Sequence, residues 1–404
     1  MCIRDSYGTV SLVANVGYQT VDDGTKEYVW HRFGSPVVSA PTVTKDPDVP
    51  TALYRWDYEE KDWKVVSGTA PWQTLIPFTG YALTTNQEQQ TTTYTFTGQL
   101  VGNADSHIDF EANGYNFFAN SYTGYSDIKT MLSSVMENPN AQKSVWVWDR
   151  ELQRYVGVSE SELNSSYNEY KEIAPLETFI LQLRDGDEGT VDVDYASAIW
   201  GNPTRRPSLG RSAQRRVQED VTGSGFQIVI RSSINEGDKL TLLEDVQYTP
   251  AFDNGYDVTK YMDKGAVNLY ATTGEEELST VATDDLRGIL LSLQTRRATS
   301  YTLTFKNVYG MVYGLEDTQT GAVVLMTEGA TYTFTAEPNS TIRGRFRVVE
   351  GSKVTTYVED TTADTTATTA KGIYSVTGQY LGNADQQNTL PAGVYIINGK
   401  KVVK

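Results

Sequence analysis

Cysteine, histidine and long apolar runs are scarce or absent in this chain of 404 residues. The single cysteine, Cys2, cannot form a disulfide within the chain, and it excludes sites built from several thiolates. The two histidines, His31 and His107, lie far apart and no Gly-x-Ser-x-Gly motif accompanies them, so nothing predicts a Ser-His-Asp hydrolase. No apolar run reaches the roughly 18 residues of a membrane span, so the sequence predicts no transmembrane helix.

Positive charge is also in short supply, because 34 lysines and arginines face 51 aspartates and glutamates and leave a net charge of −17. Binding to nucleic acid or to an anionic membrane needs clustered Lys and Arg, so the composition argues against both partners. Carboxylates are plentiful, but a catalytic pair is defined by its separation in space, and no pair stands out in the sequence. We therefore expect a protein that is not an enzyme and has no cofactor, apart from the calcium ion considered below.

Tyrosine, threonine and glycine are abundant instead, and the apolar runs are short and alternate with polar residues. Period-two alternation indicates strands, and the Gly, Asn and Asp residues between the runs indicate turns. The predicted fold class is mostly β, with tandem antiparallel β-sandwich domains, few short helices and a small C-terminal β module. The strands predicted in the C-terminal half are Gln227–Ile230, Lys239–Leu243, Tyr301–Phe305, Thr331–Thr335 and Arg345–Val349.

Residues 7 to about 200 contain a divergent internal repeat. A Trp-Asp pair ends a predicted strand at Trp56 and again at Trp148, and an aromatic residue follows the tryptophan seven positions later in both copies. The gap after each pair predicts a hairpin loop that begins at the aspartate. The corresponding stretches are Trp30–Ser35 with Tyr115–Ser121, Leu53–Asp57 with Val145–Asp149, Trp63–Val66 with Tyr155–Val158, and Pro77–Leu83 with Pro175–Leu181.

One short helix is expected in the second copy. The segment Tyr125–Met136 carries apolar residues at helical spacing, and Ser126 is placed to cap its N-terminus. The apolar positions are Ile128, Met131, Leu132 and Val135.

Two stretches have compositions that cannot bury a core. Residues 201–221 hold five arginines and almost no apolar side chains, and they predict an exposed linker that is solvated or docks onto an acidic face. Residues 351–370 are rich in Thr, Ala and Asp and predict an extended tether.

The densest acidic loop is a candidate calcium site. Asp253, Asn254, Asp257 and Asp263 can supply oxygen ligands for Ca²⁺, a hard cation, although the spacing is not that of an EF-hand loop. The alternative is a turn in which Asn254-Gly255 takes positive φ and the aspartates cap nearby N–H groups. The sequence leaves both interpretations open.

Aromatic residues on strand faces form a second candidate site. Exposed Tyr and Trp rings can stack on sugars, and the candidates are Trp63, Trp72, Tyr81 and Tyr122. The alternative is ordinary cross-strand packing in sheets that favour aromatic residues. A glycan or a host-matrix protein is the ligand that the first interpretation predicts.

The last residues, 371–404, contain two short apolar strands, Ile373–Val376 and Gly393–Ile397, and then Asn398-Gly399 before a final strand, Lys400–Lys404. An Asn-Gly pair between apolar runs is a strong hairpin signal. This stretch resembles the C-terminal sorting domain of the type IX secretion system of Bacteroidetes. The resemblance is carried by Ile373, Tyr374, Gly378, Leu390, Pro391, Ala392, Gly393, Val394, Tyr395, Gly399, Lys400, Lys401, Val402 and Val403.

The resemblance implies an address at the outer surface of a bacterium. The type IX machinery and its sortase-like peptidase would be the partners, because the tail is recognised, removed and replaced by a surface anchor. The order of repeat, β-sandwich and tail is similar to a recurrent architecture of Bacteroidales surface proteins. Thr361 and Thr365 also resemble Asp-Thr-X acceptors of O-glycosylation, with a plain tether as the alternative.

The first six residues, MCIRDS, resemble a translated sequencing adapter, so we expect them to be foreign and native N-terminal sequence to be missing. The expected division of the chain is: 1–6, adapter; 7–108, first β copy, truncated; 109–200, second β copy; 201–221, arginine-rich linker; 222–350, β-sandwich; 351–370, threonine-rich linker; and 371–404, sorting tail.

The sequence supports two functions from different classes. The first is a secreted or surface-anchored, non-catalytic β protein with a role in adhesion, glycan contact or as a stalk. The second is the accessory C-terminal region of a secreted hydrolase whose catalytic domain lies in the missing N-terminal part.

Overall fold

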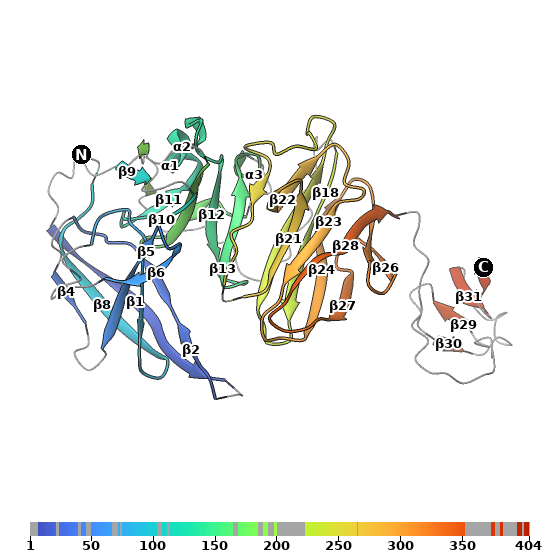
Figure 1. Cartoon of the computed structure of the whole chain (residues 1–404), viewed down its shortest axis with the longest axis horizontal. Coiled ribbons are helices and arrows are strands. Elements are labelled where there is room, and N and C mark those ends of the chain that lie inside the picture. The colour runs from blue at the N-terminus through green and yellow to red at the C-terminus, as the bar shows by residue number, and fades with distance from the viewer. Residues whose placement is uncertain are drawn as a thin grey trace. The chain divides into compact units, whose positions relative to one another are not determined.

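The structure is a computed structural model, and it confirms a mostly β chain with antiparallel sheets and few short helices (Figure 1). The chain divides into two compact units, Met1–Thr356 and Tyr357–Lys404. None of the helices in the described chain has the length and apolar character that a membrane crossing requires. The structure describes residues 7–21, 24–38, 42–45, 50–66, 72, 75–102, 107–110, 114–164, 169–184, 189–192, 198–199, 223–264, 266–351, 373–375, 380–382, 394–397 and 400–403.

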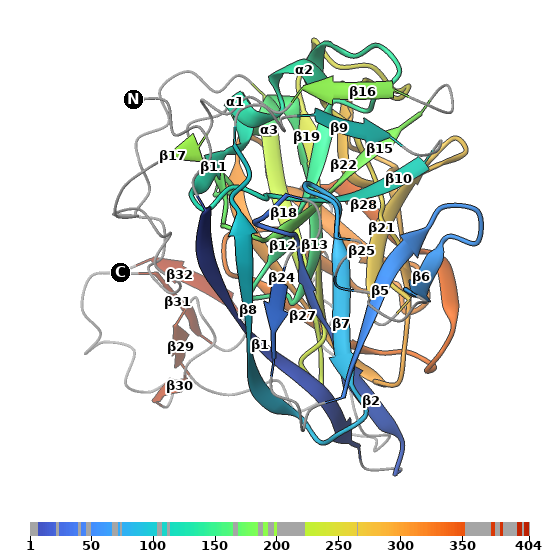
Figure 2. The same ribbon diagram turned by 90° about the vertical axis from the view of Figure 1, so that its left-hand side faces the viewer.

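The first copy of the repeat consists of two four-stranded sheets, ordered β2-β1-β8-β4 and β3-β7-β5-β6 (Figure 2). Strand β1 is long and alternates between exposed and buried side chains, with Leu12, Ala14 and Val16 facing a shared core. The strands are β1 (Tyr7–Thr20), β2 (Lys26–Val29), β3 (His31–Phe33), β4 (Thr42–Thr44), β5 (Thr51–Asp57), β6 (Asp62–Val65), β7 (Tyr81–Thr85) and β8 (Gln90–Gln99).

The second copy is built on one four-stranded sheet, ordered β10-β15-β12-β13, with smaller sheets and short helices beside it. Its core is a separate cluster that includes residues of both helices α1 and α2. The elements are β9 (His107–Phe110), β10 (Gly114–Ala119), β11 (Tyr125–Asp127), α1 (Ile128–Met131), α2 (Ser133–Glu137), β12 (Ser144–Asp149), β13 (Arg154–Ser159), α3 (Glu160–Asn164), β14 (Glu172–Ile173), β15 (Thr178–Leu183), β16 (Gly189–Asp192) and β17 (Ala198–Ile199).

The two predicted copies share a sheet order and several details of the backbone. Sheet β3-β7-β5-β6 has the same order as β10-β15-β12-β13, so β3, β7, β5 and β6 correspond to β10, β15, β12 and β13. Both hairpin loops place their last residue at positive φ, Lys61 at 51° and Gln153 at 55°. As predicted, the aspartate begins each turn: Asp57 Oδ1 accepts from the Glu60 N–H, and Asp149 Oδ1 accepts from the Leu152 N–H.

The predicted helix exists, but its N-cap is wrong by one residue. Asp127 caps α1, because its carboxylate accepts a hydrogen bond from the Thr130 N–H at 2.9 Å. Ser126 is fully buried, and its hydroxyl instead donates to Asn120 Oδ1. The helical stretch is also split into α1 and α2 at Leu132.

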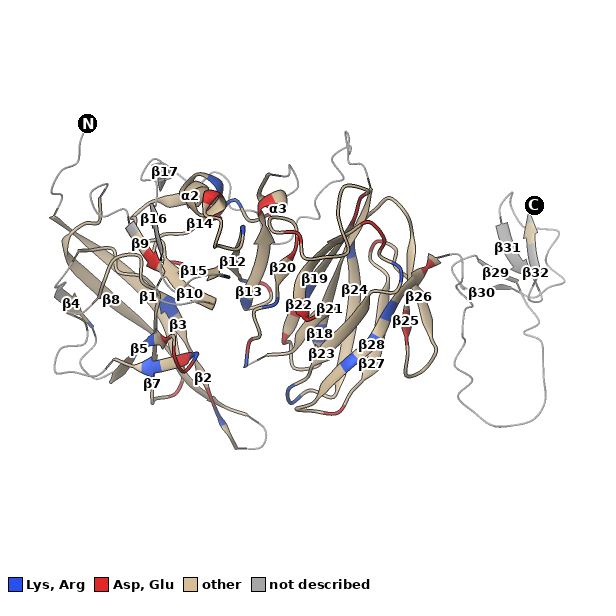
Figure 3. Cartoon of the chain, turned by 45° about the horizontal axis from the view of Figure 1, so that its top comes forward, with Lys and Arg blue, Asp and Glu red and all other residues tan. Residues whose placement is uncertain are grey.

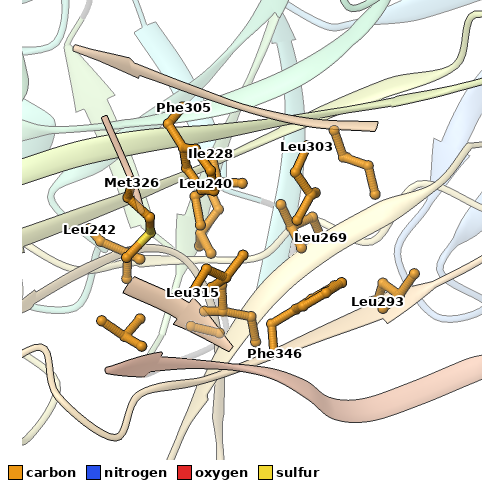
Figure 4. Close-up of a cluster of buried hydrophobic side chains, with 14 of the residues drawn as sticks. Ile228, Leu240, Leu242, Leu269, Leu293, Leu303, Phe305, Leu315, Met326 and Phe346 are labelled. Carbon is orange, nitrogen blue, oxygen red and sulfur yellow. The ribbon is translucent and has the colours of Figure 1, made fainter. Parts of the chain in front are cut away.

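The C-terminal half of the first unit is one eleven-stranded sheet that contributes its side chains to a single apolar core (Figure 4). All five strands predicted there are present, and among the described strands of this sheet β19 and β22 pair in parallel. The strands are β18 (Ser224–Ser232), β19 (Gly237–Glu244), β20 (Val258–Thr259), β21 (Asn268–Thr273), β22 (Glu276–Thr283), β23 (Leu290–Gln294), β24 (Ser300–Tyr309), β25 (Tyr313–Asp317), β26 (Val323–Leu325), β27 (Thr331–Thr335) and β28 (Thr341–Glu350).

The second unit contains the three predicted tail strands and one more. β29 (Ile373–Ser375), β30 (Tyr380–Gly382), β31 (Val394–Ile397) and β32 (Lys400–Val403) form a sheet ordered β30-β29-β31-β32. Ile397 pairs with Lys400, so the connection between β31 and β32 is two residues long, as the Asn-Gly signal predicts. Tyr395 lies in β31, and Lys400 and Lys401 lie in β32. Several other positions named above lie outside the described residues: Thr361, Thr365, Gly378, Leu390, Pro391, Ala392, Gly393 and Gly399.

The two copies are joined by reciprocal contacts between equivalent residues. The Gly34 N–H donates to the Leu176 carbonyl at 2.9 Å, and the equivalent Ala119 N–H donates to the Phe78 carbonyl at 2.8 Å. Phe78 and Leu176 occupy equivalent positions with positive φ, 61° and 64°, and each belongs to the core cluster of the other copy. The junction therefore has approximate two-fold symmetry.

The closest approach at this junction lies between Gly34 and Ala119. A Cβ at position 34 would lie 2.3 Å from the Ala119 Cβ, closer than two carbon atoms can pack. The absence of a side chain at Gly34 is therefore what lets the two backbones exchange their hydrogen bonds.

We predict that Gly34→Ala destabilises the chain by about 1–3 kcal/mol through overpacking and that Ala119→Gly, in the same molecule, restores most of that loss. Urea unfolding of both single variants and the double variant measures the coupling. Gly102→Ala is the control, because a Cβ there meets nothing within 4 Å. Equal losses in the single Gly34→Ala variant and the double variant would contradict the proposed contact.

Candidate functional site

A hollow of about 540 Å³ lies on the first copy between strand β2 and the β5–β7 pair. Its aromatic wall consists of Tyr28, Trp30 and Tyr54, and the rings of Trp30 and Tyr54 meet edge to face at 4.5 Å. Tyr28 is 40% exposed and Trp30 is 36% exposed, so the aromatic wall faces solvent. A volume of this size is within the range of small-ligand and peptide sites.

The described polar groups of the hollow are uncharged. Thr51, Thr85 and Asn86 belong to the wall, and none of the described lining residues carries a charge. Asn86 Oδ1 accepts a hydrogen bond from the Tyr28 hydroxyl at 3.0 Å. Thr85 is 1% exposed and its hydroxyl is buried, so the accessible polar groups of the wall are those of Tyr28 and Asn86. The hollow therefore suits a neutral ligand that has both apolar surface and hydrogen-bonding groups.

The four aromatic residues singled out in the sequence do not share a surface. Tyr81 and Tyr122 are at most 1% exposed, so their rings offer no face to a ligand. Trp72 packs on the core of the first copy, with its ring stacked on Tyr94 at 5.6 Å. Trp63 is partly buried against Phe117 of the second copy, at 4.9 Å between ring centroids. Sequence reasoning missed Tyr28, Trp30 and Tyr54, for which strand alternation gives no exposure signal.

The acidic loop uses its side chains as turn and junction acceptors. The Asp257 carboxylate accepts from the Asp253 N–H and the Ala282 N–H, both at 2.7 Å, and burial raises its pKa to about 6. Asn254 Oδ1 accepts from the Lys143 N–H of the second copy. Asp263 lies apart, beside Asn268. Within the described chain, no three His, Cys, Asp or Glu side chains come together to hold a metal ion, and the calcium site stays a prediction.

At the junction of the two copies, one residue of each copy packs against aromatic rings of the other copy. Phe117 of the second copy lies between Trp56 and Trp63 of the first, at 4.6 and 4.9 Å. Arg32, the equivalent of Phe117, lies over Trp148 and Tyr155 of the second copy at 5.1 and 5.4 Å. The tryptophans of the two Trp-Asp pairs thus hold the copies together.

The second copy holds the large sheet through an equivalent aromatic pair. Tyr115 and Trp146 correspond to Trp30 and Tyr54, and their rings meet edge to face at 5.1 Å. The Trp146 indole donates to the Thr259 carbonyl at 3.3 Å, and the Tyr115 hydroxyl is 3.1 Å from the Thr259 hydroxyl. The Thr259 hydroxyl also reaches the side-chain carbonyls of Gln142 and Gln182. Strand β20 of the large sheet therefore covers this face of the second copy.

A buried charge cluster lies at the same junction. Arg154, fully buried in β13, places its Nε 3.2 Å from Asp238 Oδ1 and donates to the Gly237 carbonyl. Lys260 Nζ lies 2.5 Å from Asp238 Oδ2. Burial, with a further contribution from Arg154, lowers the pKa of Lys260 to about 8 against the opposing effect of Asp238. One carboxylate thus serves two buried cations.

Loops of the large sheet also reach the first copy. Lys264 Nζ lies 3.3 Å from Asp62 Oδ2, and Arg297 pairs with Glu27 of β2. Elsewhere the described basic residues are interleaved with acidic ones across several strands (Figure 3). The three β parts of the first unit therefore contact one another pairwise.

The chain is similar to a bacterial surface-fibre protein. It is 25% identical over 373 residues to the minor fimbrium subunit Mfa5 of Porphyromonas gingivalis, a match that covers 84% of this chain and 30% of the fimbrial protein. The chain therefore spans less than a third of that relative's length. No protein-family model and no solved structure matches the chain.

We predict that Asp238→Asn destabilises the chain by about 3–5 kcal/mol, because it leaves Arg154 and Lys260 buried without a carboxylate. Urea unfolding at pH 7 measures the change. Glu60→Gln, in the exposed pair with Lys64, is the matched control and should leave the midpoint unchanged. A similar small effect for both variants would show that the buried cluster does not stabilise the junction.

His31 should make the chain acid-sensitive. Burial, aided by the charge of Arg32, lowers its pKa from 6.5 to about 4, so between these values the unfolded chain binds a proton that the folded chain does not. Stability therefore falls as the pH drops below about 6.5, by about 2 kcal/mol between pH 7 and pH 5.

The measurement is urea unfolding at pH 7 and pH 5 for the chain and for His31→Asn, which carries the residue found at the equivalent position, Asn116. The carboxylates titrate in both proteins, so the difference between the two proteins isolates the histidine. An identical loss of stability in both would contradict the assignment to His31.

Proposed function

We propose that this chain is a rigid, non-catalytic part of a fimbrial or related surface protein of a Bacteroidetes bacterium, located outside the cell. The similarity to a minor fimbrium subunit supports this assignment. Two buried junctions support a rigid role. At the first, the two copies exchange core residues, and at the second, the Arg154–Asp238–Lys260 cluster holds the large sheet on the second copy. A stalk that carries load needs such joints rather than flexible linkers.

The tail supplies the export step of this proposal. Its four-stranded sheet and its resemblance to type IX sorting domains support recognition by that secretion system. The role as an accessory region of a hydrolase is the weaker candidate, because the relative is a fimbrial subunit.

Removal of Gly372–Lys404 should leave the protein in the periplasm of a type IX-competent host, while the full chain, sent to the periplasm by a fused signal peptide, reaches the surface. Antibody labelling of intact cells, compared with labelling of permeabilised cells, measures the distribution.

Replacement of residues 351–370 by a Gly-Ser segment of equal length is the control, and it should not affect delivery. Surface labelling of the form without its tail would refute the export route. Retention of the full chain in the periplasm would do the same.

A further inference from the structure

The open hollow of the first copy and the covered face of the second copy are equivalent places in the repeat. Trp30 corresponds to Tyr115 and Tyr54 to Trp146, so each copy carries one tyrosine and one tryptophan in edge-to-face contact. The correspondence extends to the rest of the wall, in which Pro50 corresponds to Gln142, Thr51 to Lys143, Thr84 to Gln182 and Asn86 to Arg184.

On the second copy, these positions are the ones that bind the large sheet. The Thr259 hydroxyl lies within hydrogen-bond distance of the side-chain carbonyls of Gln142 and Gln182, and the Lys143 N–H donates to Asn254. Arg184 pairs with Glu276 and stacks on Phe252, 3.9 Å from the ring centroid. This face of the repeat is therefore a docking surface whose occupant, in one copy, is an extended segment with a β-branched and a hydroxyl-bearing residue, Val258-Thr259.

On the first copy, the same face has no such occupant among the described residues. The hollow remains there, with exposed Trp30 and Tyr28 on its aromatic side and the Asn86 side chain in its wall. Val65, which takes the place of Gly157, is 57% exposed beside it. A partly exposed aromatic pair, at the position that binds an extended segment in the other copy, calls for the same kind of occupant.

We propose that the hollow of the first copy binds an extended, hydroxyl-bearing segment of a neighbouring β subunit, in the way that the second copy binds Val258-Thr259. The occupant is uncharged where it enters, because the charged residues Lys143 and Arg184 of the second copy are replaced here by Thr51 and Asn86. This inference rests on the proposed role in a surface fibre, where β subunits lie next to one another.

The test uses the full chain and a blocked synthetic peptide, GYNVTQYM, which has the sequence of residues 255–262 with Asn and Gln in place of the charged Asp257 and Lys260, because the proposed occupant is uncharged. Isothermal titration should give saturable binding with one peptide per chain. Trp30→Ala should weaken binding about tenfold or more, because it removes half of the aromatic pair.

Two milder changes keep the test decisive if Trp30→Ala does not fold. Tyr28→Ala, which removes an exposed ring of the wall, and a peptide with valine in place of Thr259, which lacks the hydroxyl, should each weaken binding roughly tenfold. Tyr7→Ala, an exposed aromatic of the same copy outside the hollow, should bind the peptide as the unchanged chain does.

Failure to bind the peptide at millimolar concentration would overturn the proposal, as would binding that Tyr28→Ala and Trp30→Ala leave unchanged. Binding of lactose or cellobiose in the hollow, abolished by Trp30→Ala, would also overturn it by assigning the site to a neutral sugar. Delivery to the cell surface is measured separately, in the experiment that removes the tail. If the peptide does not bind but delivery is normal, this inference is wrong and the proposed function is unaffected.

Discussion

The approach of Gly34 to Ala119 is the constraint on which the rest of the first unit depends. At this distance the two backbones exchange hydrogen bonds, and each copy then passes one side chain into the core of the other. Phe78 and Leu176 accept positive φ, a conformation that costs energy for a bulky residue, because full burial in the opposite core compensates for it. Neither copy can therefore complete its core alone.

The same face of the repeat is covered by the large sheet in the second copy and is open in the first copy. In the second copy, Gly157 lies where a side chain would collide with Val258, so the large sheet can pack closely against it. Arg154 of the same copy pairs with Asp238 of the large sheet. The first copy kept the aromatic pair but has Val65 and uncharged residues around it. One architecture thus supplies both an internal junction and a surface for an external partner.

The buried ionic cluster sets the geometry of that junction more than its strength. A buried ion pair gains little over apolar packing, because each ion must lose its hydration. Two cations share one carboxylate here, however, so a shift of the large sheet relative to the second copy would leave a buried charge unpaired. Arg154, Asp238 and Lys260 therefore favour a single seating of the large sheet on the second copy.

Local patterns in the sequence were sufficient for the strands, the hairpin turns at Asp57 and Asp149, the repeat and the tail hairpin. Strand alternation and turn chemistry act over a few residues, so a single sequence contains them. The same locality explains the misplaced cap: Ser126 and Asp127 are both good caps, and burial of Ser126 against Asn120 decided between them.

Only the tertiary structure decided which faces are covered. Alternation shows that residues share a face of a sheet, but it does not show whether another domain lies on that face, so Tyr81 and Tyr122 could not be told from Trp30 and Tyr54. The charge cluster joins residues that lie far apart in the chain, and no local signal marks such a meeting. The sequence by itself determined the strands and the repeat, and packing between the copies and the large sheet determined what remains open to bind.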